Sequence, residues 1–433
     1  MPRGADGMRV DPSTERLTRE DAARWHMATR ENPMVIGGLL LFDAPIAIET
    51  LEAVVHARLV PHARFRQHVV EPGRWFARPR WRDDQGFDVR EHVRALPMAP
   101  VERGDLGRLV SERMNAALPR DRSPWALELV DVASGGSALI VRFQHCLADG
   151  RALVTLLEEL ADEPGSESVP PAARHEPESA GRAGLRAGLA GAARFFARSL
   201  APRGPRWPRP RRALSGRKQV AWSAELPMDR VKAIAHGRGH HVADVLLAAV
   251  AGALERAHEG GRRPRTIQSL FPVAAPSPTG GLGNHFASVF VRLPLSRVGA
   301  QARLELVARE MAAVRGGGAL RSALTLMRLA GAAAPALERW AIRWWARRAA
   351  LVVSSLAGPP SPVQLAGERL ASTVVWAPAP ASIGVSLTFF GYAGRLHVGV
   401  LTDEALGVSP EHLVTCFHEA LDELDRAAPA LTP

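Results

Sequence analysis

Along both halves of the chain, apolar runs of strand length alternate with segments of helical spacing. In the first half, residues 34–42 and 138–143 have the length and composition of buried strands, and residues 48–59 and 151–160 those of amphipathic helices. The second half shows the same alternation, with expected helices at 242–254 and 322–350 and expected strands at 266–273 and 287–293. Alternation of this kind is typical of α/β domains. We therefore predict a bilobal α/β protein.

A segment of different composition separates the two halves. Residues 162–218 are rich in Pro, Gly, Ala and Arg, which is the composition of a crossover or linker. Between residues 172 and 218, eleven arginines and one lysine stand against two glutamates, so this part of the segment carries nearly all of the net charge of +11. We expect an N-terminal lobe over 1–161, a linker over 162–218 and a C-terminal lobe over 219–433.

The basic segment has three interpretations. Nucleic-acid binding needs stacking aromatic residues between the basic ones, and only Phe195, Phe196 and Trp207 are available, so we expect no nucleic-acid partner. A membrane-surface helix needs arginines on one face and apolar residues on the other, which 189–200 supplies. A solvated, arginine-rich crossover explains the segment equally well. Three tryptophans and four arginines between 339 and 348 form a second patch with the same ambiguity, so peripheral contact with an anionic membrane or lipid droplet stays open.

The cellular compartment follows from cysteine usage and hydropathy. Cys146 and Cys416 are the only cysteines, which excludes a disulfide scaffold and a multi-cysteine metal site and fits a reducing compartment. No apolar run occurs in residues 1–19, so we expect no signal peptide. The uncharged stretches 349–367 and 370–394 are broken by Pro and Gly, which favours buried strands over membrane helices. We predict a cytoplasmic protein without a transmembrane segment.

One short motif, Q-H-C-L-A-D-G at 144–150, has the character of a site. It joins the expected strand at 138–143 to the expected helix at 151–160. Burying an imidazole and a carboxylate is costly unless both are paired. His145 suits a general base because the histidine pKa lies near neutrality, while Asp149 would fix the loop and Gly150 would permit the turn into the helix. A core histidine beside a helix-capping aspartate explains the same spacing.

Two other groupings suggest chemistry less strongly. Cys146 beside His145 could form a Cys–His nucleophile pair, but neighbouring residues at a strand end point to opposite faces, so we expect Cys146 in the core. His240, His241 and Asp244 could suggest a metal site, yet His241 and Asp244 stand where a helix begins and no third ligand to join them is nearby in sequence. We expect helix capping there and no metal ion.

The motif at 144–150 resembles the H-H-x-x-x-D-G motif of the CoA-dependent acyltransferase superfamily. Other segments resemble one branch of it, the bacterial wax ester synthase/diacylglycerol acyltransferase family. The resembling segments, in chain order, are N-P-M-V-I-G-G-L at 32–39, A-R-F-R-Q at 63–67, Pro124-Trp125, Gly283-Asn284 and S-L-A-G-P at 355–359. Two departures stand out, since Gln144 replaces the first histidine of the motif and Ser355 stands where the family usually has Asn.

The resemblance implies two chloramphenicol-acetyltransferase-like lobes, each a mixed sheet with flanking helices, and a central channel with His145 near its middle. It also implies transfer of a long-chain acyl group from CoA to a fatty alcohol or diacylglycerol, giving wax ester or triacylglycerol.

His145 would be the base, acyl-CoA a co-substrate rather than a cofactor, and Asp149 would pair with an arginine. Gln144, Gly150 and Asn284 would support the site. The departures leave two alternatives: another alcohol or amine acceptor, or a non-catalytic lipid-binding protein of the same fold.

Overall fold

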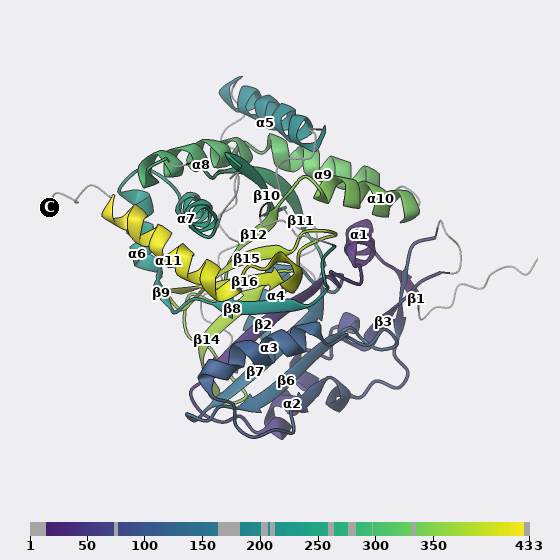
Figure 1. The fold of residues 1–433 in the computed structure, drawn as a ribbon. Helices are drawn as coiled ribbons and strands as arrows, with labels where there is room; N and C mark the ends of the chain where they lie inside the picture. Colours follow the sequence, from purple (N-terminus) through teal and green to yellow (C-terminus); the bar gives the residue numbers. More distant parts are fainter. Residues whose placement is uncertain are drawn as a thin grey trace, which may run out of the picture.

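The computed structural model describes residues 14–72, 77–162, 182–200, 207, 213–258, 264–275, 283–296, 298–330 and 335–427. Two large sheets form two lobes, which lie one above the other in Figure 1. A small third sheet, ordered β1-β4-β3, flanks the first lobe. Its strands are β1 (Thr14–Arg16), β4 (Arg80–Asp83) and β3 (Gln67–Val70). The two-lobed α/β architecture predicted from the sequence is confirmed.

The first large sheet has helices on both faces. In spatial order its strands are β13 (Gln364–Leu365), β14 (Glu368–Trp376), β2 (Val35–Phe42), β7 (Ser137–Gln144), β6 (Trp125–Asp131) and β5 (Val93–Ala95). Leu139 and Phe143 of β7 pack against α2 (Ile48–Arg58) and α4 (Gly150–Leu160). Ile140, on the opposite face of β7, packs against α3 (Leu106–Asn115).

The second large sheet carries the larger core. Its strands, in spatial order, are β11 (Phe286–Pro294), β10 (Thr266–Ala274), β12 (Leu351–Ala357), β15 (Val385–Tyr392), β16 (Arg395–Asp403) and β8 (Lys218–Trp222), with β9 (Leu226–Pro227) paired to β16. The helices that pack on its core include α6 (Met228–His236), α7 (Val242–Arg256), α8 (Ala300–Arg315) and α11 (Pro410–Arg426). Helix α7 is almost wholly buried because its sequence is apolar on every face.

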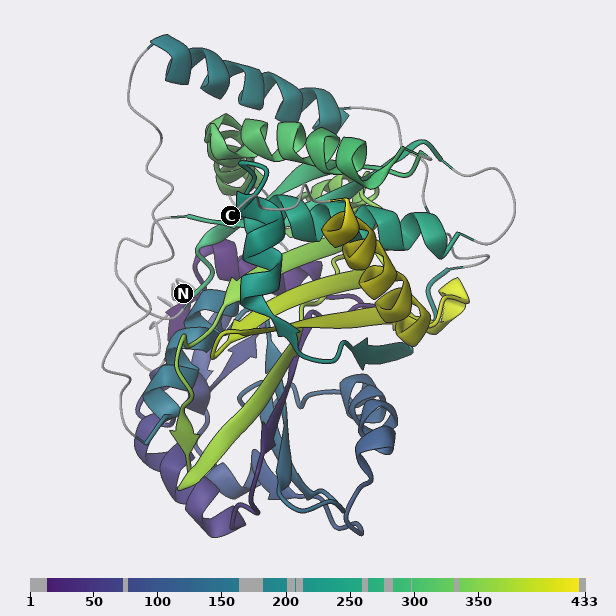
Figure 2. The same cartoon turned by 90° about the vertical axis from the view of Figure 1, so that its left-hand side faces the viewer.

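One strand crosses from the second half of the chain into the first lobe. Residues 219–433 are expected in the C-terminal lobe, but β14 pairs antiparallel with β2 of the first lobe, and Val374 lies opposite Leu39. Figure 2 shows this light-green strand extending down beside the purple strands of the first lobe. The exchange supplies β2 with a hydrogen-bonded neighbour on its second edge. The boundaries expected from composition therefore do not follow the sheets at β13 and β14.

Much of the expected linker, namely 163–181, 201–206 and 208–212, lies outside the described residues. Between those ranges, α5 (Arg182–Leu200) packs on the outside of the second lobe, at the top of Figures 1 and 2. Phe195 is buried in the core of that lobe, and Arg198 forms an ion pair with Glu310 of α8. This part of the linker is therefore a packed helix, as the spacing at 189–200 predicted for its second half.

The predicted helical stretch at 322–350 is two helices. Helix α9 (Gly318–Ala330) ends before α10 (Pro335–Ala346) begins, and a proline is tolerated in the first turn of a helix but not in its interior. Among the described residues, no helix has both the length and the apolar character needed to cross a bilayer.

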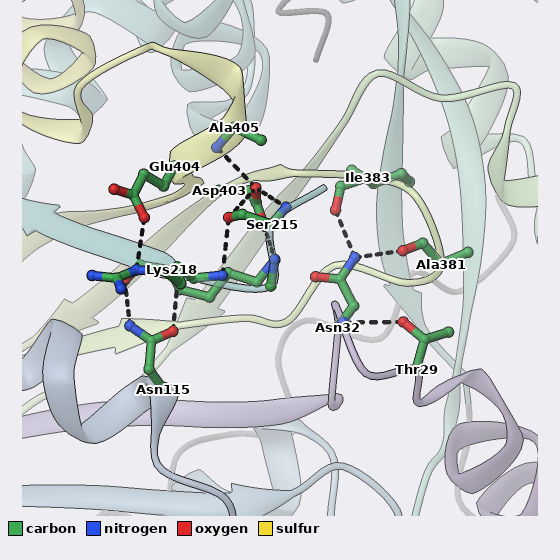
Figure 3. A network of polar contacts seen from close by, with 12 residues as sticks. Thr29, Asn32, Asn115, Ser215, Lys218, Ala381, Ile383, Asp403, Glu404 and Ala405 are labelled. Atoms are coloured by element: carbon green, nitrogen blue, oxygen red, sulfur yellow. Dashed lines mark hydrogen bonds and ion pairs between the residues drawn. The ribbon is translucent and has the colours of Figure 1, made fainter. Parts of the chain in front are cut away.

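Polar contacts hold the lobes together on both sides of the shared interface (Figure 3). Asn115 of α3 exchanges two hydrogen bonds with the backbone of Lys218 in β8, at 2.6 and 2.8 Å. The Nδ2 group of Asn32 donates to the carbonyl oxygens of Ala381 and Ile383, at 2.6 and 2.9 Å. Asn32 belongs to the N-P-M segment of the sequence, and these contacts give it a structural reason to be asparagine.

Candidate active site

A cavity of about 390 Å³ lies between the two lobes. The first lobe contributes His145, Asp149 and Gly150, and α1 (Arg19–Met27) contributes Arg24. The second lobe contributes residues of β10, β11, β12, α9 and α10, including Phe286. Three residues of the Q-H-C-L-A-D-G motif therefore border one interlobe cavity.

His145 reaches the cavity because β7 ends one residue before it. The His145 N–H donates to the carbonyl oxygen of Met34 at 2.8 Å, which ties the turn after β7 to the start of β2. The imidazole is only 8% exposed and stacks on the ring of Phe286, with centroids 5.5 Å apart. Its Nδ1 atom has no hydrogen-bond partner among the described residues.

Burial controls the charge of His145. Loss of solvation, followed by the nearby positive charge of Arg24, lowers the pKa of His145 to about 4. The imidazole is therefore neutral at neutral pH. A neutral imidazole can accept a proton, which is what a general base requires.

Arg24 is a functional candidate that the sequence analysis missed. It is buried on α1, lines the cavity, and places its guanidinium carbon 4.2 Å from the centre of the Phe286 ring. Burial lowers the pKa of Arg24 to about 10, so the side chain stays positively charged at neutral pH. A Thr followed three positions later by an acidic residue is a helix-start signal, and at the start of α1 the Asp21 N–H donates to Thr18 Oγ1. That signal does not tell which arginine of the helix points inward.

The carboxylate of Asp149 binds backbone N–H groups of both lobes. Its Oδ1 accepts from the N–H groups of Arg151 and Ala152 at 3.0 Å, so Asp149 caps α4 as its sequence position suggested. Its Oδ2 accepts from the N–H of His285 in the second lobe at 2.8 Å. Within the described residues Asp149 makes no ion pair, so the arginine partner implied by the resemblance is replaced by three backbone N–H groups.

Asn284 supports the motif from the second lobe. Its Nδ2 donates to the carbonyl oxygen of His145 and to Oδ1 of Asp21, each at 2.8 Å. The preceding Gly283 has a φ of 141°, which an L side chain rarely adopts, so glycine is required at this turn. Asn284 therefore holds the backbone of His145, and it is not among the residues that border the cavity.

The remaining sequence candidates lie away from the cavity. Gln144 is buried at the end of β7 but does not border the cavity. Cys146 lies in the core of the first lobe, as predicted, and burial raises the pKa of its thiol well above the usual value, which makes it a poor nucleophile. His241 and Asp244 form the capping box of α7, again as predicted. No three metal-ligand side chains gather anywhere in the described ranges.

A second cavity, of about 90 Å³, adjoins the first. It lies among apolar side chains of the first sheet, α2 and α4, and Gly150 and Leu356 border both cavities. A Cβ atom on Gly150 would lie 2.6 Å from a side-chain carbon of Leu356. The glycine of the motif therefore leaves room where the two cavities meet.

Comparisons with known families agree over most of the chain. A family model described as "Wax ester synthase/diacylglycerol acyltransferase catalytic domain" matches residues 17–203, and one described as "WS/DGAT C-terminal domain" matches residues 282–425. The chain is 26% identical over 430 residues to the "Probable diacyglycerol O-acyltransferase tgs1" of Mycobacterium tuberculosis, covering 91% of this chain and 92% of that protein. The tgs2 protein of the same organism is 31% identical over 260 residues, covering 52% of this chain and 56% of that protein.

Solved structures show the same fold. The wax ester synthase/diacylglycerol acyltransferase from Marinobacter aquaeolei VT8 superposes with a TM-score of 0.69 at 20% identity, covering 96% of this chain and all of that chain. The first condensation domain of the calcium-dependent antibiotic synthetase gives a TM-score of 0.63 at 17% identity, covering 96% of each chain. Both similarities support the two-lobed fold.

Proposed function

The chain belongs to the wax ester synthase/diacylglycerol acyltransferase family, and on this basis we propose that it transfers a long-chain acyl group from CoA to the hydroxyl of an apolar alcohol or diacylglycerol, with His145 as the base. It is thus an acyltransferase that makes neutral lipid. The main support for the role of His145 is its buried, neutral imidazole in the cavity between the lobes.

The proposed reaction is a direct transfer. His145 takes the proton of the acceptor hydroxyl as its oxygen attacks the thioester carbonyl carbon. The tetrahedral intermediate collapses, the carbon–sulfur bond breaks, and the imidazolium returns the proton to the CoA thiolate. Arg24 supports this scheme, since its positive charge would stabilise the negative charge that develops on the carbonyl oxygen in the tetrahedral intermediate. The buried Cys146 offers no alternative covalent route.

The supporting residues position the base in this proposal. Asp149 fixes the turn into α4 and binds the 283–285 turn, while Asn284 holds the carbonyl of His145. Gly150 keeps the passage beside Leu356 free of a side chain. Gln144 supports the turn that carries His145 from the end of β7, where its backbone N–H donates to the carbonyl oxygen of Pro124 at 2.9 Å.

The test is release of free thiol from acyl-CoA by the purified full chain, with a panel of acceptors. His145→Ala should lower turnover by about 10²- to 10⁴-fold, the usual contribution of a positioned base. His236→Ala, at an exposed histidine of α6, is the matched control and should change nothing. A His145→Ala protein with normal melting and near-normal turnover would instead support the non-catalytic lipid-binding alternative.

Contact with a lipid surface is a second, finer proposal. Leu337 and Trp340 of α10 are 56% and 60% exposed, and Arg343 lies exposed on the same helix. Other residues of α9 and α10 border the cavity, so the exposed apolar side chains lie on elements that also form its wall. We infer that this face docks on an anionic membrane or lipid inclusion, from which apolar substrates enter.

The docking proposal predicts binding to anionic vesicles that exceeds binding to neutral ones and weakens with salt. Replacing Leu337 and Trp340 by Ser should reduce the binding to anionic vesicles. Leu306→Ser, at an exposed leucine of α8, is the control and should have no effect. Equal binding to both vesicle types, or none to either, would contradict the proposal.

A further inference from the structure

A buried acidic side chain borders the interlobe cavity on the α10 side. Glu338 is only 3% exposed and is one of the residues that line the cavity. Its Oε2 lies 2.7 Å from Nδ1 of His26 on α1, whose side chain is also 3% exposed. Its Oε1 has no hydrogen-bond partner among the described residues. The neighbouring lining residues of α10, Ala341 and Ile342, offer it no polar group.

Asp149 provides an instructive contrast in the same cavity. The two oxygens of Asp149 receive three backbone N–H groups, which fully accounts for its burial. Glu338 has one partner for two oxygens that can together accept about four hydrogen bonds. A buried polar group without a partner costs free energy. The protein thus keeps acceptor capacity beside a substrate cavity that its own described residues do not use.

The chemistry of Glu338 restricts what it can meet there. A carboxylate disfavours the phosphates of CoA, since like charges repel. The acyl chain and the thioester have no hydrogen to donate. The amide N–H groups of the CoA pantetheine arm are the same for every acceptor, so Glu338 can select between acceptors only through a donor on the acceptor molecule. The terminal torsion of a glutamate is broad, so a small rotation can present Oε1 to such a donor.

We propose that Glu338, held by His26, accepts a hydrogen bond from a second hydroxyl of the acceptor, so that the preferred acceptor is a long-chain diol rather than a simple fatty alcohol. One hydroxyl reacts at His145 and the other binds Glu338. His26 is a positioning residue, because it contacts Glu338 and does not border the cavity. This inference rests on the proposed acyltransfer and specifies its acceptor class.

The experiment compares acceptors of equal length with one acyl donor. Purified full-length protein receives palmitoyl-CoA with hexadecanol, or with hexadecanediols whose second hydroxyl is vicinal, central or terminal, and thiol release gives kcat and KM for each. For at least one diol, kcat/KM should exceed that of hexadecanol by about tenfold or more, as expected for a hydrogen bond to a carboxyl group in a buried site. An amino alcohol of the same length tests for charge recognition.

Three variants separate recognition from structure. Glu338→Leu should abolish the diol preference, mainly by raising the KM for the diol. Glu338→Gln should retain part of the preference, because its amide oxygen still accepts, and it guards against unfolding of the Leu variant. Thr155→Val, which removes a hydroxyl from the α4 side of the same cavity, should keep the preference.

Each outcome decides the question. A wild-type protein that esterifies hexadecanol and every diol equally well would overturn this inference and leave the acyltransfer intact. The same holds if both Glu338 variants keep the wild-type diol preference, or if only the amino alcohol is preferred. Absence of turnover with every acceptor would refute the acyltransfer and this inference with it.

Discussion

The low pKa of His145 makes a prediction about stability that is independent of any substrate. The folded chain lowers this pKa from 6.5 to about 4, chiefly by burial. Above pH about 6.5 the imidazole is neutral in both folded and unfolded chains, so it contributes nothing to the pH dependence. Between about 6.5 and 4 the unfolded chain binds a proton that the folded chain refuses, and the folded state is destabilised. Below about 4 both states are protonated.

The magnitude follows from the shift. About 2.5 pKa units correspond to a loss of roughly 3 kcal/mol in the free energy of unfolding once the pH lies below both pKa values. At pH 5 the loss is about 2 kcal/mol. Replacing His145 by Gln removes the titrating group while filling most of its space. The variant should therefore lose about 2 kcal/mol less stability than wild type between pH 7.5 and pH 5.

The assay is urea unfolding of both proteins at the two pH values, analysed as the difference between their two losses. The other histidines cancel in that difference, because both proteins contain them. Activity gives a second readout, since wild-type turnover should persist below pH 6 and decline only as the pH approaches 4. Equal stability losses in the two proteins, together with an activity inflection near 6.5, would refute a buried, neutral His145.

Three further predictions concern the motif and the packing. Gln144→His should keep turnover within about one order of magnitude, because Gln144 does not border the cavity and an amide shuttles no proton; a loss as large as that of a His145 variant would contradict this. Gly252→Ala should destabilise the protein by about 1 kcal/mol in chemical denaturation, because its Cβ would lie 2.8 Å from that of Ala420 on α11, and overpacking outweighs the gain in helix propensity; a more stable variant would show that the helices can separate freely. Leu153→Trp should narrow the second cavity and lower turnover of long-chain acyl-CoA while sparing short chains; a uniform loss across chain lengths would argue against a chain bound there.

Local signals in the sequence were sufficient for most elements of the fold. Strand β7 was predicted within one residue at each end, and helix α4 within one residue, because an apolar run and an amphipathic run flank a capping Asp149. The pairing of β14 with β2 was not predicted. Strand composition reports burial but not the identity of the neighbouring strand, and these two strands are more than 300 positions apart in the chain.

The same limit applies to the candidate site. His145 was found because the motif is contiguous, and Asn284 because of its resemblance to a family segment. Arg24 and Glu338 were missed because their surroundings come from distant parts of the chain. The contact between His26 and Glu338 spans 312 positions, and that between Arg24 and the carbonyl of Phe286 spans 262.

Helix α1 shows why such residues cannot be identified from the pattern of polar and apolar residues in the sequence. Three of its nine residues are polar, buried and directed at the second lobe: Asp21 accepts from Asn284, Arg24 donates to the carbonyl of Phe286 at 3.4 Å, and His26 bonds Glu338. Polarity normally marks the solvent face of a helix, so the pattern of α1 suggests the wrong face. The helix is a polar connection between the lobes, and its contacts lead to the backbone of His145, the ring stacked on His145 and the carboxyl group on the α10 side of the cavity. The environment that keeps His145 neutral therefore exists only when both lobes and α1 are assembled.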